Sequence, residues 1–167
     1  DPGTPGFAVA VQQMMPAGRR VEEAVRTFYD RHEGGNLIVM LGRNPLYPPA
    51  EIDRAALLLD QDDDAVVFAA SGPAEDSPIA LVAVRRCHPG LFAFPDPDLP
   101  GPDLHSIVAS DVMIHPLRVM RIVSGCSDLP WLMHEVERGV LLGHWFPRRT
   151  YEVLKIMKRR LIIPEAQ

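Results

Sequence analysis

The sequence predicts an α/β fold in which a mostly parallel sheet is flanked by helices. Three short apolar runs, over residues 36–41, 65–70 and 79–84, are each bounded by turn residues, as in strands that are covered on both faces. Between the first two runs, residues 49–59 place Ile52, Ala55, Ala56 and Leu59 at the spacing of one helical face. An alternation of strand and helix is typical of a sheet covered by helices.

The other elements have local signals of their own. Residues 7–12 (FAVAVQ) predict a short strand, and residues 19–32 predict a helix that ends at Gly34-Gly35. Pro49 suits the first turn of the helix over 49–59 because proline lacks the amide that this turn does not use. Residues 92–104 contain four prolines and predict an extended loop. The remaining predicted elements are a strand over 117–123 and covering helices over 129–138 and 149–161.

Composition limits the classes of function. A chain of 167 residues with 47% hydrophobic content can bury one substantial core, which predicts a single domain over 1–167. The formal charge of −5 argues against nucleic acid or an anionic membrane as the main partner. No apolar run is long enough to span a membrane. Cys87 and Cys126 lack metal-ligand or disulfide-framework spacing, so we expect a reducing, cytoplasmic environment, with an organelle as the alternative.

The acidic run DQDDD, at residues 60–64, has two interpretations. It can be a solvated connection from helix to strand, or a cluster that binds a cation. Consecutive carboxylates point in divergent directions, so the solvated connection is favoured.

Four motifs occur in an informative order. They are a strand that ends in Leu41-Gly42 before a proline-rich turn, GPAED at 72–76, RRCHPGLF at 85–92 and PRRT at 147–150. In this order, over residues 7–154, the chain resembles a bacterial family of short GT-A-like glycosyltransferases of the nucleotide-diphospho-sugar transferase superfamily. The resemblance implies an α/β sheet that binds a nucleotide. It also implies a sheet that is N-terminally incomplete here, so 1–167 is either one GT-A-like domain or the C-terminal part of a longer one.

The resemblance also implies candidate site residues. Asp76 would be the catalytic acid that binds or deprotonates the acceptor. The residues implied for nucleotide or substrate binding are Gly42, Arg43, Asn44, Pro73, Glu75 and Arg148.

The sequence departs from the family at positions that matter for chemistry. Where family members carry a metal-binding aspartate this chain has Asn44, and Arg43 adds a positive charge beside it. The family's D-V-D-T falls on residues 122–125 (IVSG), which keep neither acid, and Asp76 is followed by Ser77-Pro78 in place of glycines. These changes predict no metal site and no cofactor, with Mg²⁺ or Mn²⁺ as the alternative for an active enzyme.

Two functions follow as hypotheses. The favoured one is a noncatalytic or catalytically impaired relative of nucleotide-sugar transferases that serves as a binding or assembly module. The alternative is an active glycosyltransferase or nucleotidyltransferase with a nucleotide-activated donor. A nucleotide sugar is the expected small ligand. An apolar strand edge left unpaired by missing first strands predicts a protein partner or a homo-oligomer.

Overall fold

The computed structural model describes residues 17–32, 34–40, 44–73, 77–88, 91–92, 112–144 and 146–160. The elements, in chain order, are α1 (Ala17–Arg31), β1 (Leu37–Met40), α2 (Pro49–Gln61), β2 (Val66–Ala70), β3 (Ile79–Val84), β4 (Ile114–Pro116), the 3₁₀-helix η1 (Cys126–Asp128), α4 (Leu129–Leu141) and α5 (Arg148–Arg159). The α/β class is therefore confirmed. The predicted strand over 7–12 and the proline-rich loop beyond Phe92 lie outside the described residues.

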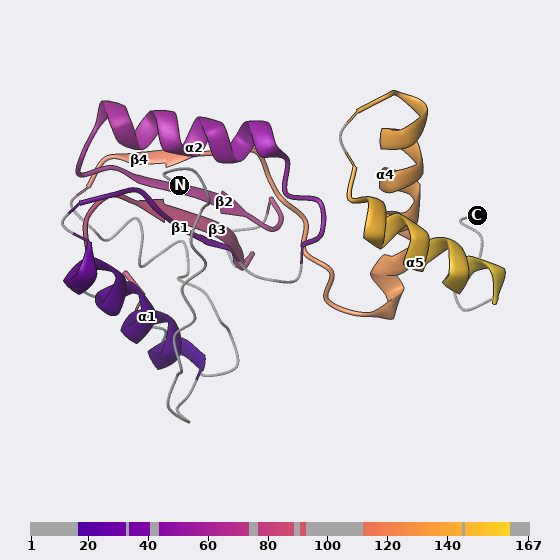
Figure 1. The fold of residues 1–167 in the computed structure, drawn as a ribbon, viewed down its shortest axis with the longest axis horizontal. Coiled ribbons are helices and arrows are strands. Elements are labelled where there is room, and N and C mark those ends of the chain that lie inside the picture. Colours follow the sequence, from indigo (N-terminus) through magenta and orange to yellow (C-terminus); the bar gives the residue numbers. More distant parts are fainter. Residues whose placement is uncertain are drawn as a thin grey trace, which may run out of the picture.

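The four described strands form one mixed sheet in the order β1-β3-β2-β4 (Figure 1). β3 is antiparallel to both β1 and β2, whereas β4 is parallel to β2. The prediction of a mostly parallel sheet was therefore wrong. The physical reason is the short connection 71–78, which is too short for the helical crossover that a parallel neighbour needs.

β1, β2 and β4 nevertheless share one direction. β1 and β2 are both antiparallel to β3, and α2 crosses over between them, while β4 is parallel to β2. The carboxyl ends of these three strands consequently lie at the same end of the sheet. Figure 1 shows α4 and α5 beyond that end. Helices α1 and α2 lie on opposite faces of the sheet.

The alternating side chains of β2 show how the two faces are filled. Val67 and Ala69 pack with Ala55 and Leu59 of α2, all without measurable exposure. Val66 and Phe68 belong to the cluster on the other face, which includes Val25 of α1. A strand that is buried on both faces has a continuous apolar sequence, which is why residues 65–70 predicted β2.

Helix α1 is held to the sheet by a tyrosine. The Tyr29 hydroxyl donates a hydrogen bond to the Val84 carbonyl oxygen at 3.0 Å. Burial, and secondarily the thiol of Cys87, raise the pKa of Tyr29 to about 12. The chain then reverses through Gly34 and Gly35, whose φ angles of 75° and 137° are costly for residues with a side chain.

The strand predicted over 117–123 was wrong: these residues form no strand, and β4 lies just before them, at Ile114–Pro116. Beyond Pro116, the amides of Leu117 and Met120 still donate to the carbonyls of Phe68 and Ala70, each at 2.8 Å. β2 ends at Ala70, so the chain beyond Met120 has no partner on that side with which to continue the ladder. Residues 121–124 instead lead to the α4–α5 hairpin.

The α4–α5 hairpin has a small core of its own. Leu132, Met133 and Val136 of α4 pack against Leu154 of α5, and Leu46 from the β1–α2 loop joins this cluster. The Arg121 guanidinium lies 4.5 Å from the centre of the Trp131 ring, where a cation–π contact forms between the connection and α4. The helices predicted over 129–138 and 149–161 are thus confirmed as α4 and α5. The expectation that they cover the sheet was wrong, since they pack mainly on each other.

The acidic run after α2 is an ion-paired connection. Arg85 contacts Asp63 at 3.0 Å and Arg86 contacts Asp64 at 2.8 Å, and all four side chains are at least one third exposed. Exposed pairs of this kind contribute little individually. The predicted solvated connection is what these residues form. Across the described part of the chain, every helix is too short or too polar to span a lipid bilayer.

Two leucines of α2 provide a matched test of this packing. Leu59 is fully buried against the sheet, whereas Leu57 is 61% exposed. We expect Leu59→Ala to lower the free energy of unfolding by about 2–5 kcal/mol, since it leaves a cavity, and Leu57→Ala to change it by less than about 0.5 kcal/mol. Urea denaturation measures both. Equal effects would mean that α2 does not pack on the sheet through Leu59.

Candidate functional site

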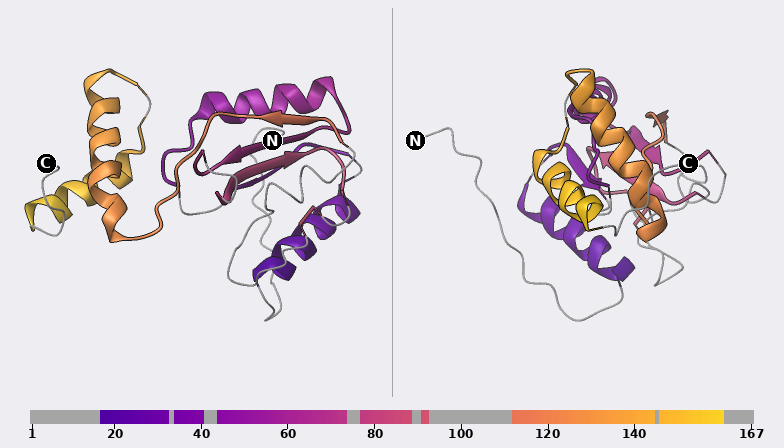
Figure 2. Two further views of the ribbon diagram at one scale, coloured as in Figure 1. Left: turned by 180° about the vertical axis from the view of Figure 1, so that it is seen from behind. Right: turned by 90° about the vertical axis from the view of Figure 1, so that its right-hand side faces the viewer.

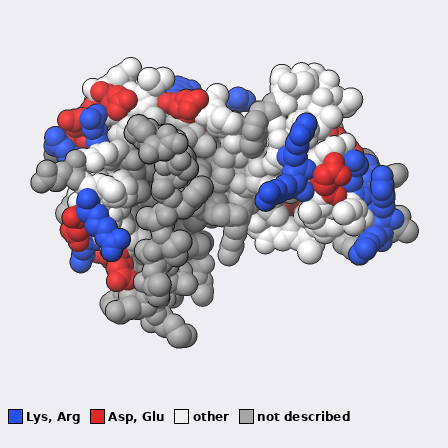
Figure 3. All heavy atoms as spheres, in the orientation of Figure 1, with Lys and Arg blue, Asp and Glu red and all other residues white. Residues whose placement is uncertain are grey.

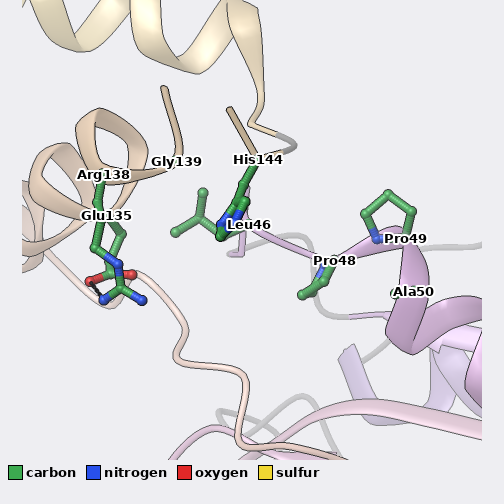
Figure 4. Close-up of a pocket in the computed structure, with 8 residues that line it drawn as sticks. All are labelled: Leu46, Pro48, Pro49, Ala50, Glu135, Arg138, Gly139 and His144. Atoms are coloured by element: carbon green, nitrogen blue, oxygen red, sulfur yellow. Dashed lines mark hydrogen bonds and ion pairs between the residues drawn. The ribbon is translucent and has the colours of Figure 1, made fainter. Parts of the chain in front are cut away.

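A cavity of about 470 Å³ opens at the carboxyl end of β1, between the start of α2 and the α4–α5 hairpin (Figure 4). We call it the α2–α4 cavity. It is lined by Leu46, Pro48, Pro49, Ala50, Glu135, Arg138, Gly139 and His144. Its volume lies within the range of small-molecule sites, and the end of the sheet where it lies is the usual place for a ligand in an α/β fold.

One wall of the cavity is apolar and comes from the β1–α2 loop. The side-chain oxygen of Asn44 accepts a hydrogen bond from the Leu46 amide at 2.7 Å, which forms a tight turn. The Tyr47 hydroxyl donates to the Ala80 carbonyl at 2.6 Å and ties the loop to β3. Pro48 then has an extended conformation and Pro49 begins α2. The loop therefore presents Leu46 and the two prolines as a fixed surface.

The opposite wall is polar and comes from α4 and the turn that follows it. Arg138 contacts Glu135, one helical turn earlier, at 3.4 Å. Gly143, with a φ of 66°, turns the chain back, and the His144 amide donates to the Gly139 carbonyl at 2.9 Å. Figure 4 shows the Arg138–Glu135 pair on one side of the cavity and the His144 ring beside Leu46.

Sequence reasoning missed the polar wall. Glu135 and Arg138 were ordinary members of the polar face of a covering helix, and His144 was one of six scattered histidines. The one usable signal is the i,i+3 pairing of opposite charges on a helix, and that pattern is common on solvated surfaces. Only the hairpin brings these residues to the proline-rich loop.

None of the three predicted site residues that the structure describes lines this cavity. Asn44, at 6% exposure, is a buried residue of the β1–α2 loop and does not line the cavity. Pro73 follows β2 and Arg148 begins α5; both are exposed, and neither lines the cavity. The other four predicted residues, Gly42, Arg43, Glu75 and Asp76, lie outside the described residues.

The connection after β2 shows one steric constraint. A Cβ on Gly72 would lie 2.8 Å from the Ser77 hydroxyl oxygen. The Ser71 amide also donates to the Pro78 carbonyl at 2.8 Å, which closes the segment at its base. A larger residue at the glycine of the GPAED motif would therefore require the Ser77 side chain to shift.

Asn44 does not fit a divalent cation. Hard cations bind best to exposed anionic oxygens, and the Asn44 oxygen is neutral, buried and already engaged by the Leu46 amide. Within the described ranges, no three His, Cys, Asp or Glu residues are grouped so that they could hold a metal ion.

Glu51 is an acid that sequence reasoning did not select. It lies in the first turn of α2 at 8% exposure, and its Oε2 atom has no hydrogen-bond partner among the described residues. A carboxylate in this position offsets the positive end of the helix dipole.

The segment that resembles the D-V-D-T motif has a nearby acid with a structural role. The Asp128 carboxylate accepts hydrogen bonds from the amides of Ser124, at 2.8 Å, and Gly125, at 3.3 Å, and it pairs with Arg121 at 2.8 Å. The Ser124 amide, and next the Arg121 side chain, lower the pKa of Asp128. This carboxylate is thus used to join β4 to α4.

Comparison with known proteins adds information on the fold. No protein-family model matches the chain, and no curated protein matches its sequence. Among solved structures, the chain is similar to the "putative nucleotide-diphospho-sugar transferase" of Desulfovibrio desulfuricans G20, with a TM-score of 0.69 and 21% identity. The match covers 90% of this chain but 63% of that one. The chain therefore has the α/β fold of that protein and spans less than two thirds of its length.

The contribution of the ionised Asp128 carboxylate to stability can be tested by changing the pH. Because folding lowers the pKa of Asp128, its carboxylate stabilises the fold above the unfolded pKa, and this contribution is lost as the pH falls through the folded pKa. We expect Asp128→Asn to lower the free energy of unfolding at neutral pH by about 1–2 kcal/mol. Hydrogen bonds to a charged group usually contribute about 1.5–3 kcal/mol, and asparagine keeps one acceptor oxygen for the backbone amides.

The difference in the free energy of unfolding between Asp128→Asn and wild type should be smaller at acidic than at neutral pH, because it shrinks as the pH falls through the folded pKa of Asp128. Chemical denaturation at the two pH values measures it, with Asp53→Asn on the exposed side of α2 as the control. An equal loss at both pH values would show that the ionised carboxylate is not what holds Ser124 and Gly125.

Proposed function

We propose that this chain is a noncatalytic or catalytically impaired relative of nucleotide-diphospho-sugar transferases that binds a nucleotide-activated sugar. The fold it shares with the D. desulfuricans protein supports the class of ligand. The α2–α4 cavity supports binding, because it has the size of a small-molecule site and lies at the carboxyl end of the parallel-oriented strands.

The main support for impaired catalysis is the hydrogen bonding and burial of the Asn44 side chain. At this position the resemblance implies a metal-binding acid, and a transferase of this kind needs a cation to balance the phosphates of its donor. Asn44 has no charge, its oxygen bonds the Leu46 amide, and it is 6% exposed. Its side chain builds the loop, so we infer that the catalytic role of the position has been replaced by a structural one.

The alternative is an active transferase, and one feature of the cavity favours it. Glu135 and His144 both line the α2–α4 cavity. Carboxylate and imidazole are the groups most often used as general bases. An enzyme that activates an acceptor with one of these residues would not need the acid that Asn44 replaces for that step.

The assembly part of the proposal rests on strand β1. Among the described residues β1 pairs with β3 alone, and Met40 at its end is 44% exposed. None of the four β1 residues carries a charge that would discourage another strand from pairing. We propose that a protein partner or a second copy of the chain covers this edge.

Calorimetry with Mn²⁺ and a panel of nucleotide sugars tests the proposal that catalysis is impaired. We expect no micromolar binding of Mn²⁺ and no gain in nucleotide-sugar affinity when the metal is added. A signal that appears in Asn44→Asp, which keeps an acceptor for the Leu46 amide, would identify the missing charge as the cause. Metal-dependent micromolar binding by wild type that is lost in Asn44→Ala would contradict the proposal.

Turnover distinguishes the two functions. We expect no release of nucleoside diphosphate from the panel of donors in the presence of Mn²⁺. Release that is abolished by Glu135→Gln, with the protein still folded by circular dichroism, would establish the enzyme instead. Gln keeps the size of the side chain and removes its capacity to accept a proton.

Sedimentation tests the strand edge. We expect the wild-type chain to self-associate at concentrations on the order of 50 µM, and Met40→Lys to weaken that association, since lysine on an edge strand opposes pairing. Leu57→Lys, on the exposed side of α2, is the matched control and should leave association unchanged. A stable wild-type monomer would remove self-assembly from the proposal.

A further inference from the structure

We infer that the α2–α4 cavity binds a phosphorylated sugar, with Arg138 and His144 contacting the phosphoryl group and Glu135 contacting sugar hydroxyls. This inference rests on the proposed function for the class of ligand. In this arrangement, protein side chains supply the positive charge that the phosphoryl group needs. Ligand contacts are also assigned to residues that the sequence pattern did not select.

Arg138 is available to a ligand. Its one contact with a described side chain is Glu135, through a single nitrogen at 3.4 Å, and the arginine side chain is 60% exposed. A pair of this length on a helix surface is weak, so its loss costs little. The guanidinium has further N–H donors in a planar arrangement that matches two oxygens of a phosphoryl group.

His144 is positioned by its backbone, which leaves its side chain free to bind. The His144 amide donates to Gly139, and the positive φ of Gly143 sets the direction of the turn. No hydrogen bond of the imidazole to another described residue is present, and the ring faces the cavity beside Leu46 (Figure 4). A neutral imidazole has one N–H donor and a charged one has two, so either form can bond a phosphoryl oxygen.

Glu135 makes the site selective. Its carboxylate repels a bare anion, but it can accept hydrogen bonds from hydroxyl groups, of which a sugar has several. The apolar wall of Leu46, Pro48 and Pro49 faces this pair across the cavity and can cover the carbon face of a sugar ring. Of the simple phosphorylated ligands, a sugar phosphate uses both walls, whereas pyrophosphate uses only the positive groups.

On the face shown in Figure 3, acidic and basic side chains are interspersed on the sheet body, whereas lysine and arginine predominate on the hairpin. Figure 2 shows α4 beyond one end of the sheet body, and residues of α4 and of the β1–α2 loop line the cavity together.

The test is calorimetry in the presence of a chelator with three probes: glucose 1-phosphate, UDP-glucose and inorganic pyrophosphate. We expect Arg138→Gln to weaken binding of glucose 1-phosphate about tenfold or more, the value of one charge-assisted pair. The affinity of Arg138→Lys for glucose 1-phosphate should lie between those of wild type and Arg138→Gln, because lysine keeps the charge but lacks the planar guanidinium. Arg159→Gln, at the far end of α5, is the matched control and should have no effect.

Glu135→Gln should change the affinities for the two probes differently, whereas general damage to the fold would weaken binding of both. We expect it to strengthen pyrophosphate binding, because a like charge is removed, and to strengthen glucose 1-phosphate binding less or to weaken it, because a hydroxyl acceptor is also weakened. His144→Gln should weaken both probes several-fold, as expected for the loss of one hydrogen bond. Thermal unfolding of the variants should match wild type, since all three side chains are on the rim of a cavity.

The outcomes separate this inference from the proposed function. UDP-glucose binding that Arg138→Gln leaves unchanged would overturn the inference and keep the nucleotide-sugar proposal. Glucose 1-phosphate binding that depends on Arg138, without measurable UDP-glucose binding, would support the inference and remove that proposal. Absence of binding by both glucose 1-phosphate and pyrophosphate would overturn the inference.

Discussion

The arrangement of this protein depends on strand β3, which lies between β1 and β2 and runs against both. All six of its residues are buried, and it forms hydrogen-bonded ladders on both of its edges. Without it, β1 and β2 would be joined only by their helical crossover. Because β3 keeps them parallel to each other, their carboxyl ends, and that of β4, come to one end of the sheet. The cavity lies at that end for this reason.

The cavity itself is formed by two parts of different character. The β1–α2 loop is held from below by Asn44 and Tyr47, so its prolines and Leu46 form a surface with little freedom. The hairpin of α4 and α5 carries its own core and meets the sheet body chiefly through Leu46 and the segment after β4. Polar groups that are free to bind a ligand are on the hairpin, whereas those of the loop are used to build it.

Two positions, Asn44 and Asp128, show polar side chains that form part of the fold itself. Where the resemblance implies a metal-binding carboxylate after β1, an amide closes a turn. Where it implies acids near residue 123, the nearest carboxylate is Asp128, which binds two backbone amides and Arg121. Polar side chains whose hydrogen-bonding capacity is satisfied inside the protein stabilise it and are poorly available to a ligand. Asn44 and Asp128 are both used in this way.

The sequence by itself determined the elements whose signals are local. Continuous apolar runs predicted β2 and β3, and residues 52–59 at helical spacing predicted α2, because burial on two faces or on one face leaves a direct periodic trace. The direction of β3 was decided by the tertiary structure, since a strand has the same apolar run whether its neighbour is parallel or antiparallel. The short connection at residues 71–78 makes β3 antiparallel to β2. The site was decided in the same way: Arg138 and His144 are nearly a hundred residues from Leu46, and no local pattern records that α4 packs across the end of the sheet.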